Sequence, residues 1–199
     1  AVAACLGKAG REDEACAALE RVLQDEPADL AARVQLARSA LLRRDPGRAR
    51  GLLAPVADSR DPTVEMALAE IEFRTGSVEV GRAALQRSLA GRAELVEPAI
   101  ALACEIGRTA PDKGHAVIGV VVEDAEAAGD TDAALQALER LLAAAPGHIP
   151  AIEEYIRICG QGFYEHQRYR AQVQLADAYL AHERWQDARA LAEQLATAR

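Results

Sequence analysis

Apolar residues recur three and four positions apart along most of the chain, which is the spacing of an amphipathic helix. The first 27 residues show the unit clearly. A helical pattern leads to a turn at Gly10, a second helical pattern follows, and Pro27 ends it. The second pattern places four apolar residues on one face: Ala15, Leu19, Val22 and Leu23. This segment therefore predicts two helices joined by a tight turn.

The same arrangement recurs along the chain. Turns are expected near Gly10, Arg44, Gly76, Gly129 and Glu183. The apolar positions that follow them are Ala15/Leu19/Leu23, Ala49/Leu53/Val56, Gly81/Leu85/Leu89, Ala134/Leu138/Leu142 and Ala188/Leu191/Leu195. A recurring helix pair is the signature of a helical repeat protein.

These positions resemble the tetratricopeptide repeat family, whose units of about 34 residues carry small, aromatic, alanine and proline positions in fixed order. The matching residues are Ala15 and Pro27 in the first copy, Ala134, Leu138 and Pro146 in the fourth, and Leu175, Ala176, Tyr179 and Ala188 in the last. The copies depart from the pattern in two ways. Only Tyr179 supplies the aromatic residue, and the second and third copies lack a proline at the expected position, with Asp61 and Pro62 following slightly later.

The resemblance implies an all-α fold, a right-handed α-solenoid of antiparallel helix pairs with about 11 to 12 helices. It implies one superhelical domain over residues 1–199. Because the chain starts and stops inside apolar patterns, we expect it to be a fragment of a longer protein.

The distances between turns predict two additional helices. The first two intervals are 34 and 32 residues, but Gly76 to Gly129 spans 53 and Gly129 to Glu183 spans 54. The surplus fits a helix of roughly 14 residues with its turn. The candidates are 95–106 and 149–158.

One segment permits another interpretation. Residues 116–124, AVIGVVVED, are rich in β-branched side chains and could form a buried strand. A helix is nevertheless the structure that we expect for this segment, because it precedes the clearest repeat and has no Gly-rich loop or partner strand.

Composition agrees with helices and excludes several function classes. The chain contains 45 Ala but only two Phe, four Tyr and one Trp. Its net charge of −8 opposes binding to nucleic acids and anionic membranes. No apolar run approaches the ~18 residues of a membrane span, so we expect no membrane insertion. A cytoplasmic location is expected, with the periplasm as the alternative because the chain is expected to be a fragment. Of the 23 basic residues 21 are Arg, which is typical of a GC-rich bacterial gene.

Catalytic and metal-binding patterns are not found. Cys5, Cys16, Cys104 and Cys159 lack zinc-site spacing, and the four His lack a helical metal motif or a serine nucleophile motif. Acidic runs such as 11–14 fall in first helical turns, where the helix dipole favours them. We therefore expect no cofactor, no metal and no enzymatic activity.

The resemblance also implies a concave groove lined by the first helix of each pair. The implied positions are Val34, Arg38, Leu41, Met66, Glu70, Phe73, Glu123, Arg170, Val173 and Asp177. The residues that clamp acidic peptide tails in some family members are replaced by Gln35, Ala67, Val120 and Gln174. Such a groove favours a peptide with basic and apolar residues, whose charges would meet the acidic groups while Met66 and Phe73 bury its anchor. Ordinary helix surface, or the core for Met66 and Phe73, is the alternative.

The leading hypothesis is thus an interaction scaffold that binds a protein or peptide partner. An alternative is a self-assembling or regulatory segment, attached to a catalytic or signalling domain outside this chain. It would form a homo-oligomer through the open ends at Val2, Cys5 and Leu6 and at Leu191 and Leu195. An enzyme, with a site near Tyr164 and His166, ranks third.

Overall fold

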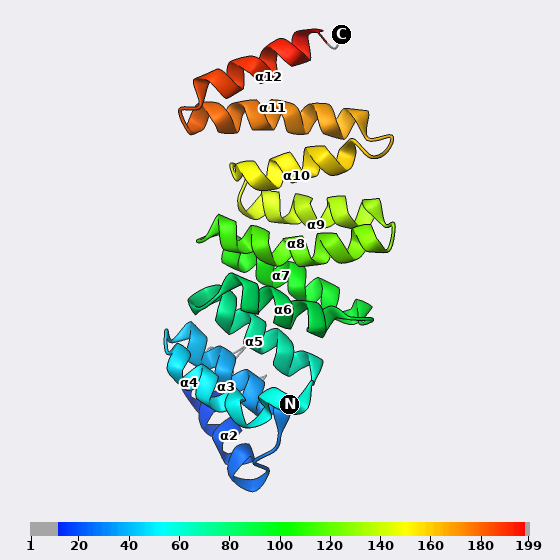
Figure 1. Ribbon diagram of the computed structural model, residues 1–199. Coiled ribbons are helices and arrows are strands. Elements are labelled where there is room, and N and C mark those ends of the chain that lie inside the picture. Colours follow the sequence, from blue (N-terminus) through cyan, green and yellow to red (C-terminus); the bar gives the residue numbers. More distant parts are fainter. Residues whose placement is uncertain (1–11, 198–199) are drawn as a thin grey trace. The chain divides into compact units, whose positions relative to one another are not determined.

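The computed structural model describes residues 12–197, which contain eleven α-helices and two short 3-10 segments and no β-strand (Figure 1). Residues 116–124 lie inside a helix, so the strand interpretation is wrong and the all-α prediction is confirmed. The chain divides into two compact units, Ala1–Leu95 and Val96–Arg199, each considered by itself below. One superhelical domain over 1–199, and its right-handed sense, stay predictions.

The first unit contains five α-helices and two 3-10 segments within its described residues. Its elements are α2 (Glu12–Asp25), α3 (Leu30–Leu42), α4 (Pro46–Leu53), the 3-10 segment η1 (Ala54–Ser59), α5 (Pro62–Thr75), α6 (Val78–Leu89) and the 3-10 segment η2 (Ala93–Leu95). Helix α3 packs on α2, α4 and α5, and α5 packs on α6. Val56 is predicted on a helix but lies in η1, because Pro55 cannot donate the backbone hydrogen bond that would continue α4.

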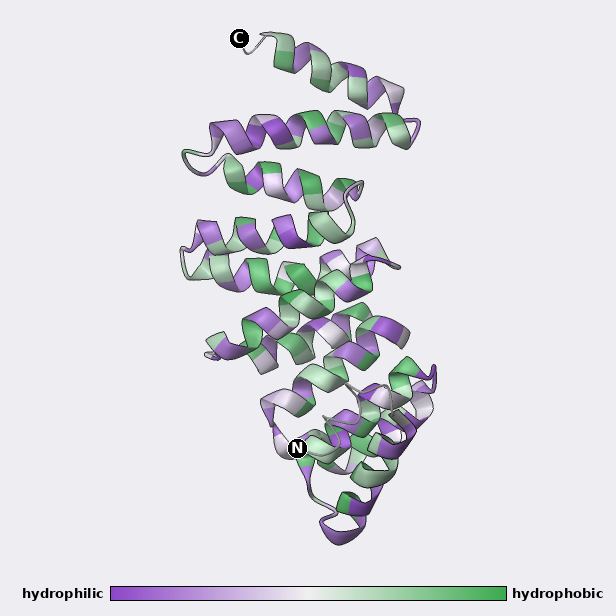
Figure 2. Cartoon of the chain, turned by 180° about the vertical axis from the view of Figure 1, so that it is seen from behind, coloured by the Kyte–Doolittle hydropathy of each residue, from purple (hydrophilic) through white to green (hydrophobic). Residues whose placement is uncertain are grey.

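The second unit contains six consecutive helices within its described residues. They are α7 (Val96–Gly107), α8 (Pro111–Ala127), α9 (Thr131–Ala144), α10 (Ile149–Cys159), α11 (Glu165–Ala181) and α12 (Trp185–Thr197). Each helix packs on the next, and α7 also packs on α9. Figure 2 colours α7 and much of α8 as hydrophobic. Helices α7 and α10 coincide with the two additional helices predicted at 95–106 and 149–158, which confirms both.

Three of the predicted turns share one backbone geometry. Arg44, Gly129 and Glu183 all adopt the left-handed conformation, with φ of 60°, 74° and 58°. The next residue then donates its N–H to a carbonyl five positions back, as Asp45 does to Ala40 at 2.9 Å. This is the Schellman ending of a helix, which satisfies its last carbonyl groups. The turn at Gly10 lies outside the described residues.

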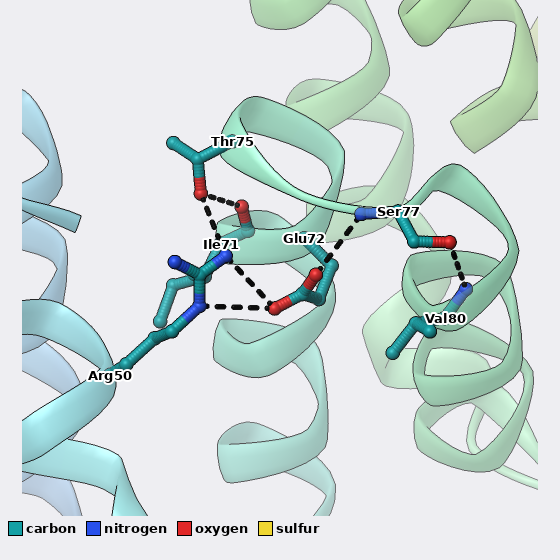
Figure 3. A network of polar contacts seen from close by, with 6 residues as sticks. All are labelled: Arg50, Ile71, Glu72, Thr75, Ser77 and Val80. Carbon is teal, nitrogen blue, oxygen red and sulfur yellow. Dashed lines mark hydrogen bonds and ion pairs between the residues drawn. The ribbon is translucent and has the colours of Figure 1, made fainter. Parts of the chain in front are cut away.

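The turn at Gly76 is built differently, by the network in Figure 3. The carboxylate of Glu72 accepts hydrogen bonds from the Arg50 guanidinium at 3.2 Å and from the backbone N–H of Ser77 at 3.1 Å. The Ser77 hydroxyl caps α6 by accepting from Val80 N–H. A Cβ at Gly76 would lie 1.9 Å from the Glu72 carboxylate, so a side chain at this position would displace that carboxylate from the network. The network joins α4, α5 and α6.

Two tyrosines tie successive helices of the second unit together. Tyr155 on α10 donates to Glu139 on α9 at 2.6 Å, and Tyr179 on α11 donates to Glu153 on α10 at 2.7 Å. Burial, and then the hydrogen bond to Glu153, raise the pKa of Tyr179 to about 12. Tyr179, the aromatic residue of the last predicted repeat, therefore acts as a buried link between two helices.

Candidate protein-binding surfaces

The apolar residues predicted to line the groove lie inside the first unit. Those concerned are Val34, Leu41, Met66 and Phe73, all at most 9% exposed. Val34 and Leu41 belong to the core cluster of α3, α4 and α5. The ring of Phe73 packs against Gly81 of α6, where a Cβ would approach it to 3.2 Å. The structure thus places all four in the core, which is the alternative considered above for Met66 and Phe73 but not for Val34 and Leu41. Met66 and Phe73 therefore cannot bury a partner's anchor.

Glu70 already has two cationic partners. Its carboxylate accepts from Nε of Arg74 at 3.1 Å and lies 3.3 Å from Nε of Arg38, while its own side chain is only 10% exposed. The Arg38 Nε is buried without a hydrogen bond, so Arg38 contributes charge rather than a directed contact. Two guanidinium groups therefore already neutralise this carboxylate. It does not favour a basic partner.

The remaining predicted residues are accessible. Glu123 on α8 is exposed, as are Arg170, Val173 and Asp177 on α11. Val173 is 40% exposed, which is high for a valine in a helix. The structure therefore keeps the predicted side chains of the second unit on its surface.

A pocket that the sequence analysis did not anticipate lies between α7, α8 and α9. We call it the α7–α9 groove; its volume is ≈ 370 Å³. It is lined by Val96, Glu97, Ile100, Val121, Asp124, Ala125, Ala128, Asp130, Ala133, Gln136, Ala137 and Arg140. Since α8 and α9 are antiparallel, the end of α8 and the start of α9 lie together, and α7 completes the wall.

The α7–α9 groove has an apolar lining with an acidic charge excess. Arg140 is held by both oxygens of Glu97, at 2.6 and 2.5 Å, and this contact raises the pKa of Arg140. Asp130 caps α9 by accepting from Ala133 N–H at 2.9 Å. Asp124 has no such internal bond within the described part of the chain. Asp124 and Asp130 are therefore the carboxylates of the groove that have no cationic side-chain partner within the described residues.

This groove has no direct signal in the sequence. The turn spacing predicts the helix at 95–106, but the contact of this helix with α9 depends on the packing of α7, α8 and α9 together. Of the predicted site residues, Glu123 precedes the groove residue Asp124 in the sequence, but it is not part of the lining. Small side chains at 125, 128, 133 and 137 are what leave the space open.

Two histidines far apart in the sequence meet between α8 and α10. His115 pairs with Glu154 at 2.6 Å and His148 pairs with Asp112 at 3.0 Å, with ring centroids 5.2 Å apart. Helix α8 thus supplies Asp112 and His115, while Glu154 comes from α10 and His148 directly precedes α10. Among residues 12–197 no group of three or more His, Cys, Asp or Glu could hold a metal ion. The two pairs link α8 to α10 and to the residue before it.

The described cysteines have the character of buried thiols. Cys16 and Cys104 are half-buried, Cys159 is buried, and none of these three forms a disulfide. Burial raises the pKa of both Cys104 and Cys159, which lowers the fraction of reactive thiolate. Cys5 lies outside the described residues.

The surfaces predicted for end-to-end assembly are only partly described. Val2, Cys5 and Leu6 lie outside the described residues, while Leu191 and Leu195 of α12 are half-buried. Assembly through these ends stays a prediction. Within the described residues, none of the helices has the length and apolar character needed to cross a membrane.

Comparisons with known proteins agree with a helical repeat. The tetratricopeptide repeat model matches residues 2–29, the first predicted repeat. Two crystal structures of MamA are similar to the chain, at 19% and 17% identity. Each covers 92% of this chain, over 96% and 91% of MamA, with TM-scores of 0.47 and 0.46. None of the curated proteins matches the chain. The repeat-family match supports the predicted resemblance to tetratricopeptide-like repeats, and both units show the corresponding sequential helix packing.

Proposed function

We propose that this protein is a non-catalytic interaction scaffold whose partner presents a basic residue beside an aliphatic anchor. The anchor occupies the α7–α9 groove and the basic residue lies against Asp124 and Asp130. Tetratricopeptide-like repeats are protein-interaction modules, which sets the general class. The observation that carries the specific proposal is a largely apolar pocket edged by two carboxylates that have no cationic side-chain partner within the described residues.

The size of the groove suits a side-chain anchor. A volume of ≈ 370 Å³ falls at the small end of the range of ligand sites. Ile100, Val121 and the surrounding alanines supply apolar contacts for an aliphatic side chain. Burying one such side chain stabilises a complex by about 1.5–3 kcal/mol.

The negative charge of the groove favours a positively charged residue on the partner. Asp124 and Asp130 attract Lys or Arg, whereas an acidic segment would be repelled. Arg140 does not offset this preference because Glu97 neutralises it.

Peptide binding tests this proposal. The probes are two fluorescein-labelled peptides, one alternating Arg and Leu and a twin with Glu in place of Arg, measured by fluorescence anisotropy. Ala128→Trp fills the groove from an exposed position, and Ala127→Trp is its matched control one residue away from the lining. Asp124→Asn removes one charge, and Asp58→Asn on exposed η1 controls for net charge.

We expect the Arg peptide to bind more tightly than the Glu peptide. Ala128→Trp should weaken its binding about tenfold or more, the equivalent of losing a buried anchor. Asp124→Asn should weaken it by about two- to fivefold, as for an exposed charge pair. Both controls should bind normally. Equal affinity for the two peptides, or an Ala128→Trp variant that binds as well as Ala127→Trp, would contradict the proposal.

A further inference from the structure

The large exposed hydrophobic side chains described in the second unit lie on α11 or within a few residues of its ends. Five are at least 40% exposed: Phe163, Tyr169, Val173, Leu180 and Trp185. Three lie on α11, and the other two stand immediately before it and at the start of α12. In Figure 1 α11 is the orange helix between α10 and α12. Exposed clusters containing Phe, Tyr and Trp are typical of protein interfaces.

The residues on α11 form a single stripe. Tyr169, Val173 and Leu180, with the half-buried Ala176, are spaced four, three and four residues apart. At ~100° per residue they fall within a sector of about 60°. The residues that α11 buries, among them Leu175 and Tyr179, lie on another side of the helix. We call this set the α11 stripe.

The spacing of the α11 stripe reads the same in both directions. When two such helices lie antiparallel, Tyr169 of one faces Leu180 of the other, and Val173 faces Ala176. A two-fold axis requires this self-complementary pattern, because the same patch must serve both copies. We propose that two copies of this chain associate through antiparallel pairing of their α11 stripes. This inference is independent of the α7–α9 groove.

Charges beside the stripe support the antiparallel direction. Arg170 and Asp177 lie on the same flank of α11, seven residues apart, and both are exposed. In an antiparallel pair these flanks face each other. Arg170 of each copy is then two residues out of register with Asp177 of the other, an offset of about 3 Å along the helix axis. Two equivalent ion pairs result. In a parallel two-fold pair these flanks would lie on opposite sides of the interface, and the two charges would not meet.

The aromatic residues at the ends fit the same arrangement. Phe163 precedes the first turn of α11 and Trp185 follows its last turn. Antiparallel helices bring the start of one beside the end of the other, so Phe163 of each copy lies at the same end of the pair as Trp185 of its partner. The exposed side chains of α11 are then contact residues, and Phe163 and Trp185 flank them. Trp185 is the single tryptophan of the chain, which makes it a specific reporter.

Self-association is measured on the whole chain by sedimentation equilibrium and by Trp185 fluorescence over about two decades of micromolar concentration. We expect the mass to rise from 21.2 kDa towards twice that value. The Trp185 emission should shift to shorter wavelength as the dimer forms. Val173→Asp should weaken association at least tenfold, whereas Val80→Asp, the same change at an exposed valine of α6, should leave it unchanged.

Charge reversal provides a second test, which leaves the apolar side chains of the α11 stripe unchanged. Arg170→Asp alone and Asp177→Arg alone should each weaken association, since each creates like-charge pairs across the axis. An equimolar mixture of the two variants should associate again. In the mixed pair one copy carries aspartate at both positions and the other carries arginine at both, so every flank charge faces its opposite.

A mass fixed at 21.2 kDa at all concentrations would overturn the proposal. So would a mixture of the two charge variants that stays monomeric when the unmodified protein dimerises. Equal weakening by Val173→Asp and Val80→Asp, with circular dichroism showing both folded, would place the interface elsewhere.

Discussion

Asp61 shows how a single side chain decides where a helix begins. It caps α5 by accepting from the N–H groups of Thr63 at 2.9 Å and Val64 at 3.2 Å, and Pro62 starts the helix. The hydrogen bond from the Thr63 hydroxyl is the main reason that the pKa of Asp61 is lowered from 3.8. A lowered pKa in the folded state means that the ionised carboxylate stabilises the fold, and that this stability is lost as the pH falls through this pKa.

Replacing this cap should destabilise the first unit measurably. We expect Asp61→Ala to lower the free energy of unfolding by about 1 kcal/mol at neutral pH, the usual contribution of an N-cap. The difference from the unmodified protein should begin to shrink below about pH 4, where the Asp61 carboxyl of the unfolded chain takes up a proton, and should continue to shrink as the pH falls through the lowered pKa of folded Asp61. Urea denaturation at several pH values measures this, with Asp58→Ala as control. A difference that stays constant down to about pH 3 would show that the charge of Asp61 is not involved.

Single-residue roles are the least predictable part of the molecule. Phe73 occupies a position that suggests a groove contact, but Gly81 on the neighbouring helix leaves room for its ring in the core. Glu70 and Arg74 are four residues apart on one helix and could be paired from the sequence, whereas the addition of Arg38 depends on α3 and α5 packing together. Exposure is a property of the packed helices, and the sequence pattern alone does not determine it.

At the scale of elements, two glycines show that α7 and α8 pack closely together in the second unit. Gly107 ends α7 and Gly114 lies in the first turns of α8. A Cβ at Gly114 would lie 2.5 Å from Cα of Gly107 and 2.8 Å from the Ala103 carbonyl oxygen. Both obstacles are backbone atoms, so a side chain here must push the two helices apart.

We therefore expect Gly114→Ala to destabilise the protein by roughly 1–3 kcal/mol, as overpacking does. The opposite result is expected for Gly51→Ala in α4, where a Cβ would meet nothing within 4 Å. There the alanine should stabilise by about 0.5–1 kcal/mol, because it restricts the unfolded chain and favours the helix. Thermal unfolding of the two variants tests both predictions. A Gly114→Ala variant at least as stable as the original protein would show that α7 and α8 do not pack this closely.

Elements are also the level at which the sequence is most informative. Turn positions at Arg44, Gly129 and Glu183, and the surplus length between turns, locate α7 and α10 without any tertiary information. Helix periodicity and turn chemistry are local properties, which is why they can be read from one sequence. The contact of α7 with α9 and the meeting of His115 with His148 are not local, and the sequence pattern predicts neither.

At the scale of the whole molecule, the two compact units carry different surface properties. In the first, the predicted groove residues Val34, Leu41, Met66 and Phe73 are buried and Glu70 is enclosed by arginines. In the second, the α7–α9 groove and the α11 stripe are accessible on separate helices. The proposed partner site and the proposed self-association surface can therefore be tested independently of one another.

The most direct test of the scaffold proposal is a ¹H–¹⁵N correlation experiment in which the Arg/Leu peptide is titrated into the protein. The account predicts chemical-shift changes that saturate at Ile100, Val121, Asp124 and Ala133, the lining of the α7–α9 groove, while the amides of the first unit remain unchanged. Shift changes confined to α3 and α5, or none at the groove lining at saturating peptide, would contradict it.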